Sequence, residues 1–557
     1  MSRKSRTYRV VPVATFDAVF VGSGINSLAG AALLARSGWG VCVLERNDEP
    51  GGCILTSTDL TLPGFTHEVL ASWHPLFTGS AAYAELKDEL DRRGVEYVNT
   101  DLPTGSLFPD GSAGFITTSL EGNIAELDRH AAGDGAAWER QFNAFMANAD
   151  LSFGILGTEL WSGAGLSLGR KAFRRLGRKG LLEFAGGTLS TCRDWVTGTF
   201  ASEQAHGLLA PWVLHTGLGP DQATSGFMTQ VIAAALQLGG MPVPVGGGVR
   251  LVEALAGIVT DAGGEVRTGA DAERILVANG RATGVRLGGG EVVAATRAVV
   301  ASVTPTQLYG RLLGGSDVPA GVSDAAVRFR YGRAEMQIHL ALDAPPQWRG
   351  TEADRLARCP IVHVTPGLDG VSRAVNEAER GLLPAEATIV CGQPVALDPT
   401  RAPDGKWIVW VQLQELPAGR VKGDAAGEID TGDGTWTEAL REQYADRILA
   451  RLGASITNLH EATLKRVVLS PADIEALNVN LVGGDIYGGS CALDQNLLWR
   501  PLAEAPGHRT AVDCLWHIGA STHPGPGLGA GSGYLVAKEL TKPPLTNRLL
   551  AKLPRRS

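Results

Sequence analysis

The chain has 557 residues, a mass of 58.4 kDa and a formal net charge of −8. Hydrophobic residues make up 44% and charged residues 19%, which indicates a folded globular protein of more than one domain and excludes a disordered chain. The negative charge argues against a general nucleic-acid-binding protein, because no global positive field attracts phosphates. Seven scattered cysteines without a C-x-x-C pair predict free thiols in a reducing cytoplasm.

The chain ends are predicted to be flexible tails, residues 1–14 and 546–557. The first of them is basic and then apolar, like the start of a secretion signal. Pro12 and Asp17 interrupt its apolar stretch, so we expect a flexible lead into a first strand instead. No apolar run reaches the eighteen or so residues that a membrane-spanning helix needs.

The first predicted unit is a strand at residues 17–21, a helix at 28–37 and a second strand at 39–44. Gly22 and Gly24 form a G-x-G turn between the first strand and the helix, with Ser27 at the third glycine position. Gly22 permits the tight turn, and Gly24 lets the backbone approach a pyrophosphate. Glu45, at the end of the second strand, is placed to accept hydrogen bonds from ribose hydroxyls. The unit predicts nucleotide binding; the alternative is a coincidental glycine turn.

Gly51 and Gly52 follow Glu45 with an E-x5-G-G spacing. This doublet resembles that of the flavin proteins of the phytoene-desaturase and amine-oxidase superfamily, where it passes close to FAD. The resemblance continues through residues 63–77, 244–255, 263–287, 483–501 and 519–527, in order over nearly the whole chain. The sequence is similar to phytoene-desaturase-like FAD-dependent oxidoreductases, in the branch with bacterial carotene ketolases and pyridine nucleotide-disulfide oxidoreductase domain-containing protein 2.

The resemblance implies an α/β fold: a discontinuous Rossmann-like FAD-binding domain of the amine-oxidase type with an inserted α+β substrate-binding domain. The FAD domain would comprise residues 15–100, 240–310 and 480–545, and the substrate region residues 101–239 and 311–479. Residues 334–343 and 406–416 look like strands, the second with period-two alternation, and residues 119–150 look helical.

The resemblance also implies where FAD binds. The glycine-rich residues 519–533 would turn from strand to helix beneath the flavin ring, with the helix N-terminus stabilising the negative charge of the reduced flavin. The residues expected to contact FAD are Gly22, Gly24, Ile25, Asn26, Ser27, Glu45, Arg46, Gly51, Gly52, Cys53, Ala272, Gly519, Gly527, Leu528, Gly529 and Ala530.

Catalytic candidates are few. His74 and His523 each belong to a motif expected near the ring, as an acid/base or, alternatively, as a structural hydrogen-bonding residue. Asp485, Asp494 and Arg500 are expected to form structural ion pairs rather than to act in catalysis. No metal-binding cluster is expected.

The resemblance implies a two-electron oxidation of a hydrophobic, conjugated or isoprenoid-like substrate, with hydride transfer to flavin N5; desaturation, ketolation and isomerisation stay open. A secondary-metabolite tailoring oxidase, an amine oxidase and a flavin-free prenyl-binding protein of the GDP-dissociation-inhibitor type are the alternatives. There is no second dinucleotide motif, so the electron acceptor is expected to be external, either oxygen, a quinone or another carrier. The basic and apolar segment Gly169–Phe184 predicts either peripheral membrane contact or a solvated helix face.

Overall fold

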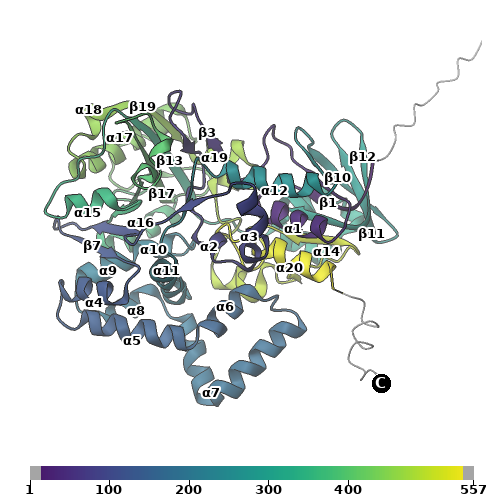
Figure 1. Ribbon diagram of the computed structural model, residues 1–557, viewed down its shortest axis with the longest axis horizontal. Helices are drawn as coiled ribbons and strands as arrows, with labels where there is room; N and C mark the ends of the chain where they lie inside the picture. Colours follow the sequence, from purple (N-terminus) through teal and green to yellow (C-terminus); the bar gives the residue numbers. More distant parts are fainter. Residues whose placement is uncertain (1–13, 543–557) are drawn as a thin grey trace, which may run out of the picture.

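The computed structural model describes residues 14–542 and is built around two seven-stranded sheets (Figure 1). The predicted tails therefore lie almost wholly outside the described residues. The first sheet has the order β10-β11-β12-β1-β2-β9, and β22 pairs with β12 beyond the end of β11. Its strands are β1 (Ala14–Val21), β2 (Val41–Leu44), β9 (Glu265–Arg267), β10 (Ala272–Ala278), β11 (Arg281–Leu287), β12 (Val292–Ser302) and β22 (Leu515–Ile518).

Five strands of the first sheet, β9, β2, β1, β12 and β22, run parallel, so their carboxyl ends meet at one edge. Successive residues of β1 point to opposite faces, and both faces are buried. Ala18 and Phe20 pack in one core with α1 (Ile25–Arg36), α3 (Ala81–Arg92), α12 (Val249–Asp261) and α20 (Gly531–Leu540). Val19 and Val21 pack in another core with β10, β11 and α14 (Ala320–Val327). The strand, helix and strand predicted at the start of the chain are confirmed.

The second sheet is mixed and has the order β19-β13-β17-β16-β14-β6-β7. Its strands are β6 (Thr104–Leu107), β7 (Ala113–Ile116), β13 (Ala334–Leu342), β14 (Ile361–Val364), β16 (Ile389–Gly392), β17 (Trp407–Leu416) and β19 (Thr463–Leu469). One face packs on α15 (Ala353–Arg358), α17 (Glu438–Ser455) and α18 (Leu459–Ala462). The strands predicted at 334–343 and 406–416 are confirmed as β13 and β17.

The helices of residues 120–239, which follow β7 in the sequence, lie beside the second sheet (Figure 1). They are α4 (Leu120–Asp128), α5 (Asp134–Ala147), α6 (Ala149–Gly157), α7 (Gly163–Leu189), α8 (Cys192–Thr199), α9 (Glu203–Leu209), α10 (Pro211–Leu214) and α11 (Ser225–Gly239). α7 projects from the body as a bent arm, and the bend is at Gly177, where φ is 64°. No helix between residues 14 and 542 is long and apolar enough to cross a bilayer.

Candidate functional site

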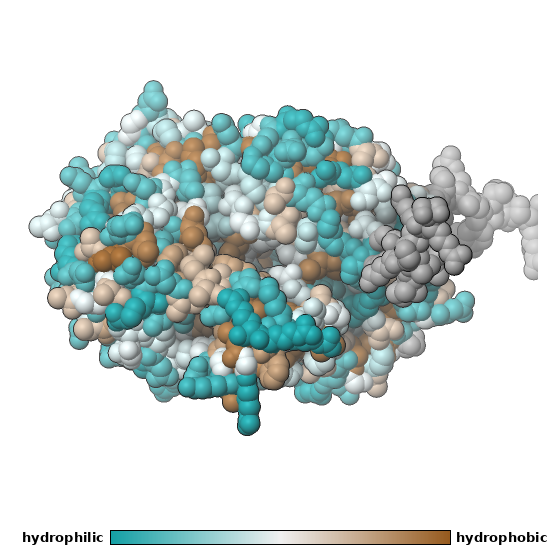
Figure 2. Space-filling model, turned by 60° about the horizontal axis from the view of Figure 1, so that its bottom comes forward, coloured by the Kyte–Doolittle hydropathy of each residue, from teal (hydrophilic) through white to brown (hydrophobic). Residues whose placement is uncertain are grey.

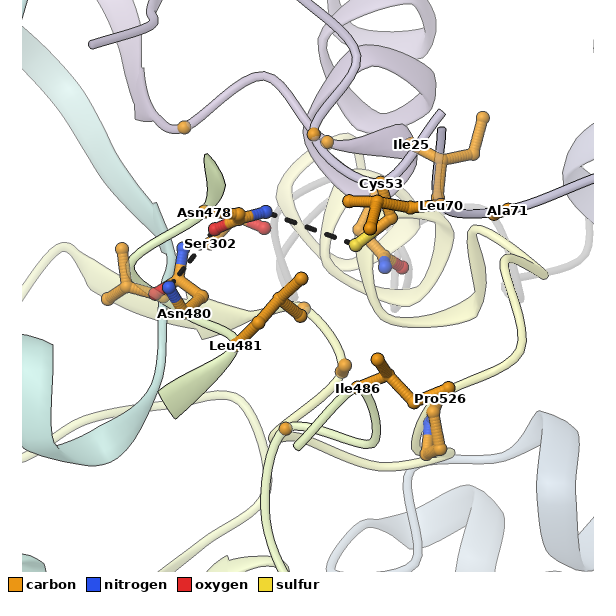
Figure 3. Close-up of a pocket in the computed structure, with 18 of the residues that line it drawn as sticks. Ile25, Cys53, Leu70, Ala71, Ser302, Asn478, Asn480, Leu481, Ile486 and Pro526 are labelled. Carbon is orange, nitrogen blue, oxygen red and sulfur yellow. Dashed lines mark hydrogen bonds between the residues drawn. The ribbon is translucent and has the colours of Figure 1, made fainter. Parts of the chain in front are cut away.

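A cavity of about 310 Å³ lies between the two sheets. One side is formed by the carboxyl ends of β1, β2 and β12 and by the loop after β22; the other is one face of β13 and β17. The loop of residues 478–481 also lines the cavity. In Figure 3, Cys53 and Leu70 lie across the cavity from Leu481 and Ile486. The crevice outside the carboxyl ends of parallel strands is where open α/β sheets bind ligands.

Glycines bring three stretches of backbone together at this edge. Gly22 has φ +88°, and a Cβ there would lie 3.2 Å from the carbonyl oxygen of Ser302. A Cβ on Gly52 would lie 2.9 Å from the Cα of Gly24, whereas a Cβ on Gly24 would meet no protein atom within 4 Å. Gly52 therefore packs against one side of Gly24, and the other side of Gly24 is open toward the cavity. Because α1 begins at Ile25 and has no acidic residue in its first turn, its amides and dipole leave positive potential there.

Glu45 organises the same edge. Its Oε2 accepts hydrogen bonds from the backbone N–H of Ser23 (3.0 Å) and from Ser23 Oγ (2.6 Å), and its Oε1 accepts one from the backbone N–H of Asn47 (2.9 Å). Ser23 Oγ in turn accepts from the N–H of Gly51 at 3.0 Å. The carboxylate thus fixes both glycine loops. A carboxylate has about four acceptor sites, so it can still accept from a ribose hydroxyl.

The returning chain forms a strand, a glycine loop and a helix, as predicted: β22 ends at Ile518 and α20 begins at Gly531. α20 packs against α1 so closely that a Cβ on Gly533 would lie 1.8 Å from the backbone oxygen of Asn26. Asn26 Oδ1 accepts a hydrogen bond from Ser532 Oγ at 2.8 Å. α20, near the end of the described residues, therefore packs on α1 and completes the site that β1 and α1 begin.

Most of the residues expected to contact FAD line the cavity: Gly22, Gly24, Ile25, Asn26, Glu45, Arg46, Gly52, Cys53, Ala272, Gly519, Gly527 and Leu528. The structure does not place Ser27, Gly51, Gly529 or Ala530 in its wall. Ser27 is buried within α1, and Gly51 supports the wall through Ser23.

The two candidate catalytic histidines do not line the cavity. His74 is buried, and its Nδ1 shares a hydrogen bond with the hydroxyl of Tyr97 (3.0 Å); burial, with a smaller effect of Arg401, lowers its pKa to about 3. Burial also lowers the pKa of His523 to about 4. The backbone carbonyl of His523 accepts a hydrogen bond from His508 Nε2 at 2.8 Å. Both histidines are therefore neutral at pH 7, and the geometry gives no support for a catalytic role.

The structural ion pairing expected for Asp485, Asp494 and Arg500 is confirmed for Asp494 and is wrong for the other two, which bond to backbone groups. Asp485 accepts hydrogen bonds from three backbone N–H groups of neighbouring loops, at 2.7 to 2.8 Å. Asp494 pairs at the surface with Arg330. Arg500 is buried and donates to the backbone oxygens of residues 487 and 520. Their structural character is confirmed, but backbone groups rather than charges satisfy two of the three.

Four polar side chains on the cavity face of the second sheet were not predicted from the sequence: Glu335, Gln337, Gln412 and Gln414. Period-two alternation in residues 406–416 was visible in the sequence. It does not tell which face meets a cavity, because that depends on how the second sheet is placed against the first.

Comparisons with known proteins agree with this architecture. Residues 21–92 match the model of the NAD(P)-binding Rossmann-like domain. The chain is 24% identical to one component of the limonene dehydrogenase of Castellaniella defragrans, over 94% of both chains, and 26% identical to pyridine nucleotide-disulfide oxidoreductase domain-containing protein 2 of Rattus norvegicus, again over 94% of both. It is 25% identical to the neurosporene-forming phytoene desaturase of Cereibacter sphaeroides, over 95% of this chain and 96% of that protein.

Solved structures share the fold at lower identity. An oxidoreductase from Methanosarcina mazei superposes with a TM-score of 0.59 at 14% identity, over 94% of this chain and 99% of that one. Putrescine oxidase bound to putrescine gives a TM-score of 0.58 at 14% identity, over 97% of this chain and 100% of that one. These two likenesses show the fold alone.

Proposed function

The chain belongs to the phytoene-desaturase-like family of oxidoreductases, and from this premise we propose that it binds FAD and oxidises a small, largely apolar, isoprenoid-like substrate by two electrons. The observation that carries the proposal is the convergence of three glycine-rich stretches, around Gly24, Gly52 and Gly519, on one cavity at the carboxyl ends of parallel strands. Such close backbone approach suits a dinucleotide.

The residues present fit FAD. The amides at the start of α1 and the open side of Gly24 suit the diphosphate, and Glu45 has acceptor capacity left for the ribose. The loop that contains Gly519 and Leu528 lines the same cavity and suits the flavin ring. FAD, when bound, supplies the acceptor of the two electrons.

The protein's part is to enclose and position an apolar molecule. Leu70, Trp73 and Trp410 line the cavity, so a substrate buried there loses its contact with water. Burial raises the pKa of the Cys53 thiol to about 11 and lowers that of His215 to about 3. Both side chains are neutral at pH 7, which suits an uncharged substrate. Other secondary metabolites and amines are the alternative substrate classes. We propose that an external acceptor, such as oxygen or a quinone, takes the electrons from the flavin.

We also propose that the α7 arm contacts membranes, where an apolar substrate would be dissolved. Phe173 and Leu182 are exposed by 55% and 64%. Arg170, Arg174 and Arg178 are exposed on the same helix, although the whole chain is acidic. Figure 2 shows hydrophobic and hydrophilic residues side by side over the face turned toward the viewer, the side from which α7 projects in Figure 1. Basic and apolar side chains together suit an anionic lipid surface.

Vesicle binding tests this arm. We expect the protein to sediment with phosphatidylcholine vesicles that contain phosphatidylglycerol, and less with phosphatidylcholine alone. Replacing Arg170, Arg174 and Arg178 by serine should lower the bound fraction, whereas Arg420→Ser, at an exposed site on another part of the surface, should leave it unchanged. Equal binding by both variants would contradict the proposal.

The visible absorption spectrum of the purified protein, before and after denaturation, tests the proposed function. We expect flavin bands, release of FAD on denaturation, and bleaching of the bands when an oxidisable substrate is added without oxygen. Absence of bound flavin, together with no binding of added FAD, would refute the enzyme and favour the flavin-free lipid-binding alternative.

A further inference from the structure

The cavity wall contributed by the second sheet carries four polar side chains beside Trp410, although the reverse face of the sheet is a hydrophobic core. β13 and β17 pair antiparallel, with Gln337 opposite Gln412. On one face Met336 and Leu413 belong to the core. On the other face Glu335, Gln337, Gln412 and Gln414 line the cavity. Burying such groups is unfavourable unless each finds a hydrogen-bond partner, so their partners show what the wall is built to bind.

The side-chain nitrogen and oxygen of Gln337 both hydrogen-bond to other groups of the protein. Its Nε2 donates to the backbone oxygen of Leu70 (3.1 Å) and to Oε1 of Glu335 (3.2 Å), and its Oε1 accepts from Nε1 of Trp410 (2.8 Å). The amide is therefore held in one orientation. It fixes Glu335 through one oxygen and leaves the other free.

Two buried polar atoms of the four side chains in this wall have no partner among residues 14–542. They are Oε2 of Glu335, a side chain that is 1% exposed, and Oε1 of Gln414, whose Nε2 donates to the hydroxyl of Tyr487 at 3.0 Å. The register pairs Ala334 with Leu416 and Met336 with Leu413, so Glu335 lies opposite the bulge that contains Gln414. The two unpartnered oxygens thus belong to neighbouring side chains on the same wall of one cavity.

The carboxyl of Glu335 is a hydrogen-bond donor at neutral pH. Burial raises its pKa to about 8, and Asp485 adds to the effect, while the amides of Gln412 and Gln337 partly oppose it. The other ionisable groups that face it, Cys53 and Tyr487, have pKa values raised by burial and are neutral at pH 7. A protonated carboxyl beside an amide oxygen offers one donor and one acceptor, and a hydroxyl group can satisfy both.

We propose that Glu335 and Gln414 form a polar subsite that binds a hydroxyl group of an otherwise apolar substrate. The subsite rests on the proposed function and gives it a substrate class: an apolar alcohol rather than a hydrocarbon. A hydrocarbon would leave both oxygens unsatisfied, and a site built to hydrogen-bond a hydroxyl discriminates strongly against the analogue that lacks it. An ammonium group is disfavoured, because the carboxyl that would pair with it is uncharged.

Binding to the FAD-loaded protein tests this subsite, with fluorescence of Trp73 and Trp410 in the cavity wall as the readout. The probes are geraniol, its hydrocarbon analogue 2,6-dimethylocta-2,6-diene and geranylamine, together with the matching C15 series built on farnesol. In at least one series we expect the alcohol to bind at least tenfold more tightly than the hydrocarbon and the amine. Glu335→Leu should abolish that preference, and Glu335→Gln, which keeps a donor and an acceptor, should restore most of it.

His339→Leu is the matched control, since His339 is buried on the same face of β13 but does not line the cavity. It should keep the alcohol preference. The subsite is refuted if neither series shows a preference for the alcohol, including the case in which no probe binds, if the amine binds best, or if His339→Leu removes the preference as well. The FAD content of each preparation, measured by absorbance, reports separately on the proposed function, so the subsite can fail while the flavin enzyme stands.

Discussion

Gly24→Ala separates cofactor binding from folding. The backbone at Gly24 has φ −61° and ψ 167°, which alanine adopts without strain, and a Cβ there meets no protein atom within 4 Å. We therefore expect the free energy of unfolding of the flavin-free protein to stay constant or to rise by up to about 1 kcal/mol, because alanine restricts the unfolded chain. The new methyl group occupies the side of the loop that faces the cavity.

The same methyl group should weaken FAD binding. An added methyl in a tightly packed contact costs about 1–3 kcal/mol, which corresponds to a Kd raised roughly 5- to 150-fold. Titration of the flavin-free protein with FAD, followed by fluorescence, gives the Kd, and calorimetry gives the Tm. Gly453→Ala in α17, where a Cβ also meets nothing, is the control and should change neither the Kd nor the fold. A wild-type Kd for Gly24→Ala would refute the placement of the diphosphate at this loop.

Three further predictions concern a close helix contact, a buried ion pair and a buried carboxyl group. Gly533→Ala, with a Cβ 1.8 Å from the oxygen of Asn26, should lower the free energy of unfolding by about 2 kcal/mol or more; an unchanged Tm would contradict the close packing of α20 on α1. Arg401→Met leaves the buried carboxylates of Glu68 and Asp398, each 3.0 Å from the guanidinium, without their cationic partner, which should cost about 3–5 kcal/mol in urea unfolding. Adding Glu68→Gln, which removes one of the two charges, should recover part of the loss. Because burial raises the pKa of Glu335 to about 8 from 4.5, the folded chain keeps a proton that the unfolded chain loses, so its stability falls as pH rises from 4.5 to 8. Glu335→Gln should remove a pH-dependent loss of up to about 5 kcal/mol (3.5 pH units at about 1.4 kcal/mol each), and parallel curves for the two proteins would contradict the raised pKa.

The nucleotide half of the site was predictable because its determinants are local. Gly22 and Gly24 can be recognised from the strand before them and the helix after them, and the structure places both where the spacing predicts. Gly533 was not interpretable in the same way, since the atom that excludes its side chain belongs to Asn26, at the other end of the chain. His74 misled for a related reason: its motif reaches the cavity through the neighbouring Trp73, while the imidazole turns to Tyr97.

The two halves of the cavity wall are built from different parts of the chain, and this governs what can vary. Much of the nucleotide half is glycine backbone, and a Cβ on Gly22 or Gly52 would press on neighbouring backbone, so the glycine motif stays recognisable in the sequence. The substrate half consists of alternate side chains on β13 and β17, whose opposite face holds the core. Those side chains can change without loss of the sheet. Glu335 and Gln414 each keep one buried oxygen without a protein partner, whereas Gln337 is already committed to three protein groups. A change of substrate in this fold is therefore expected to begin at these two positions, with the cofactor site intact.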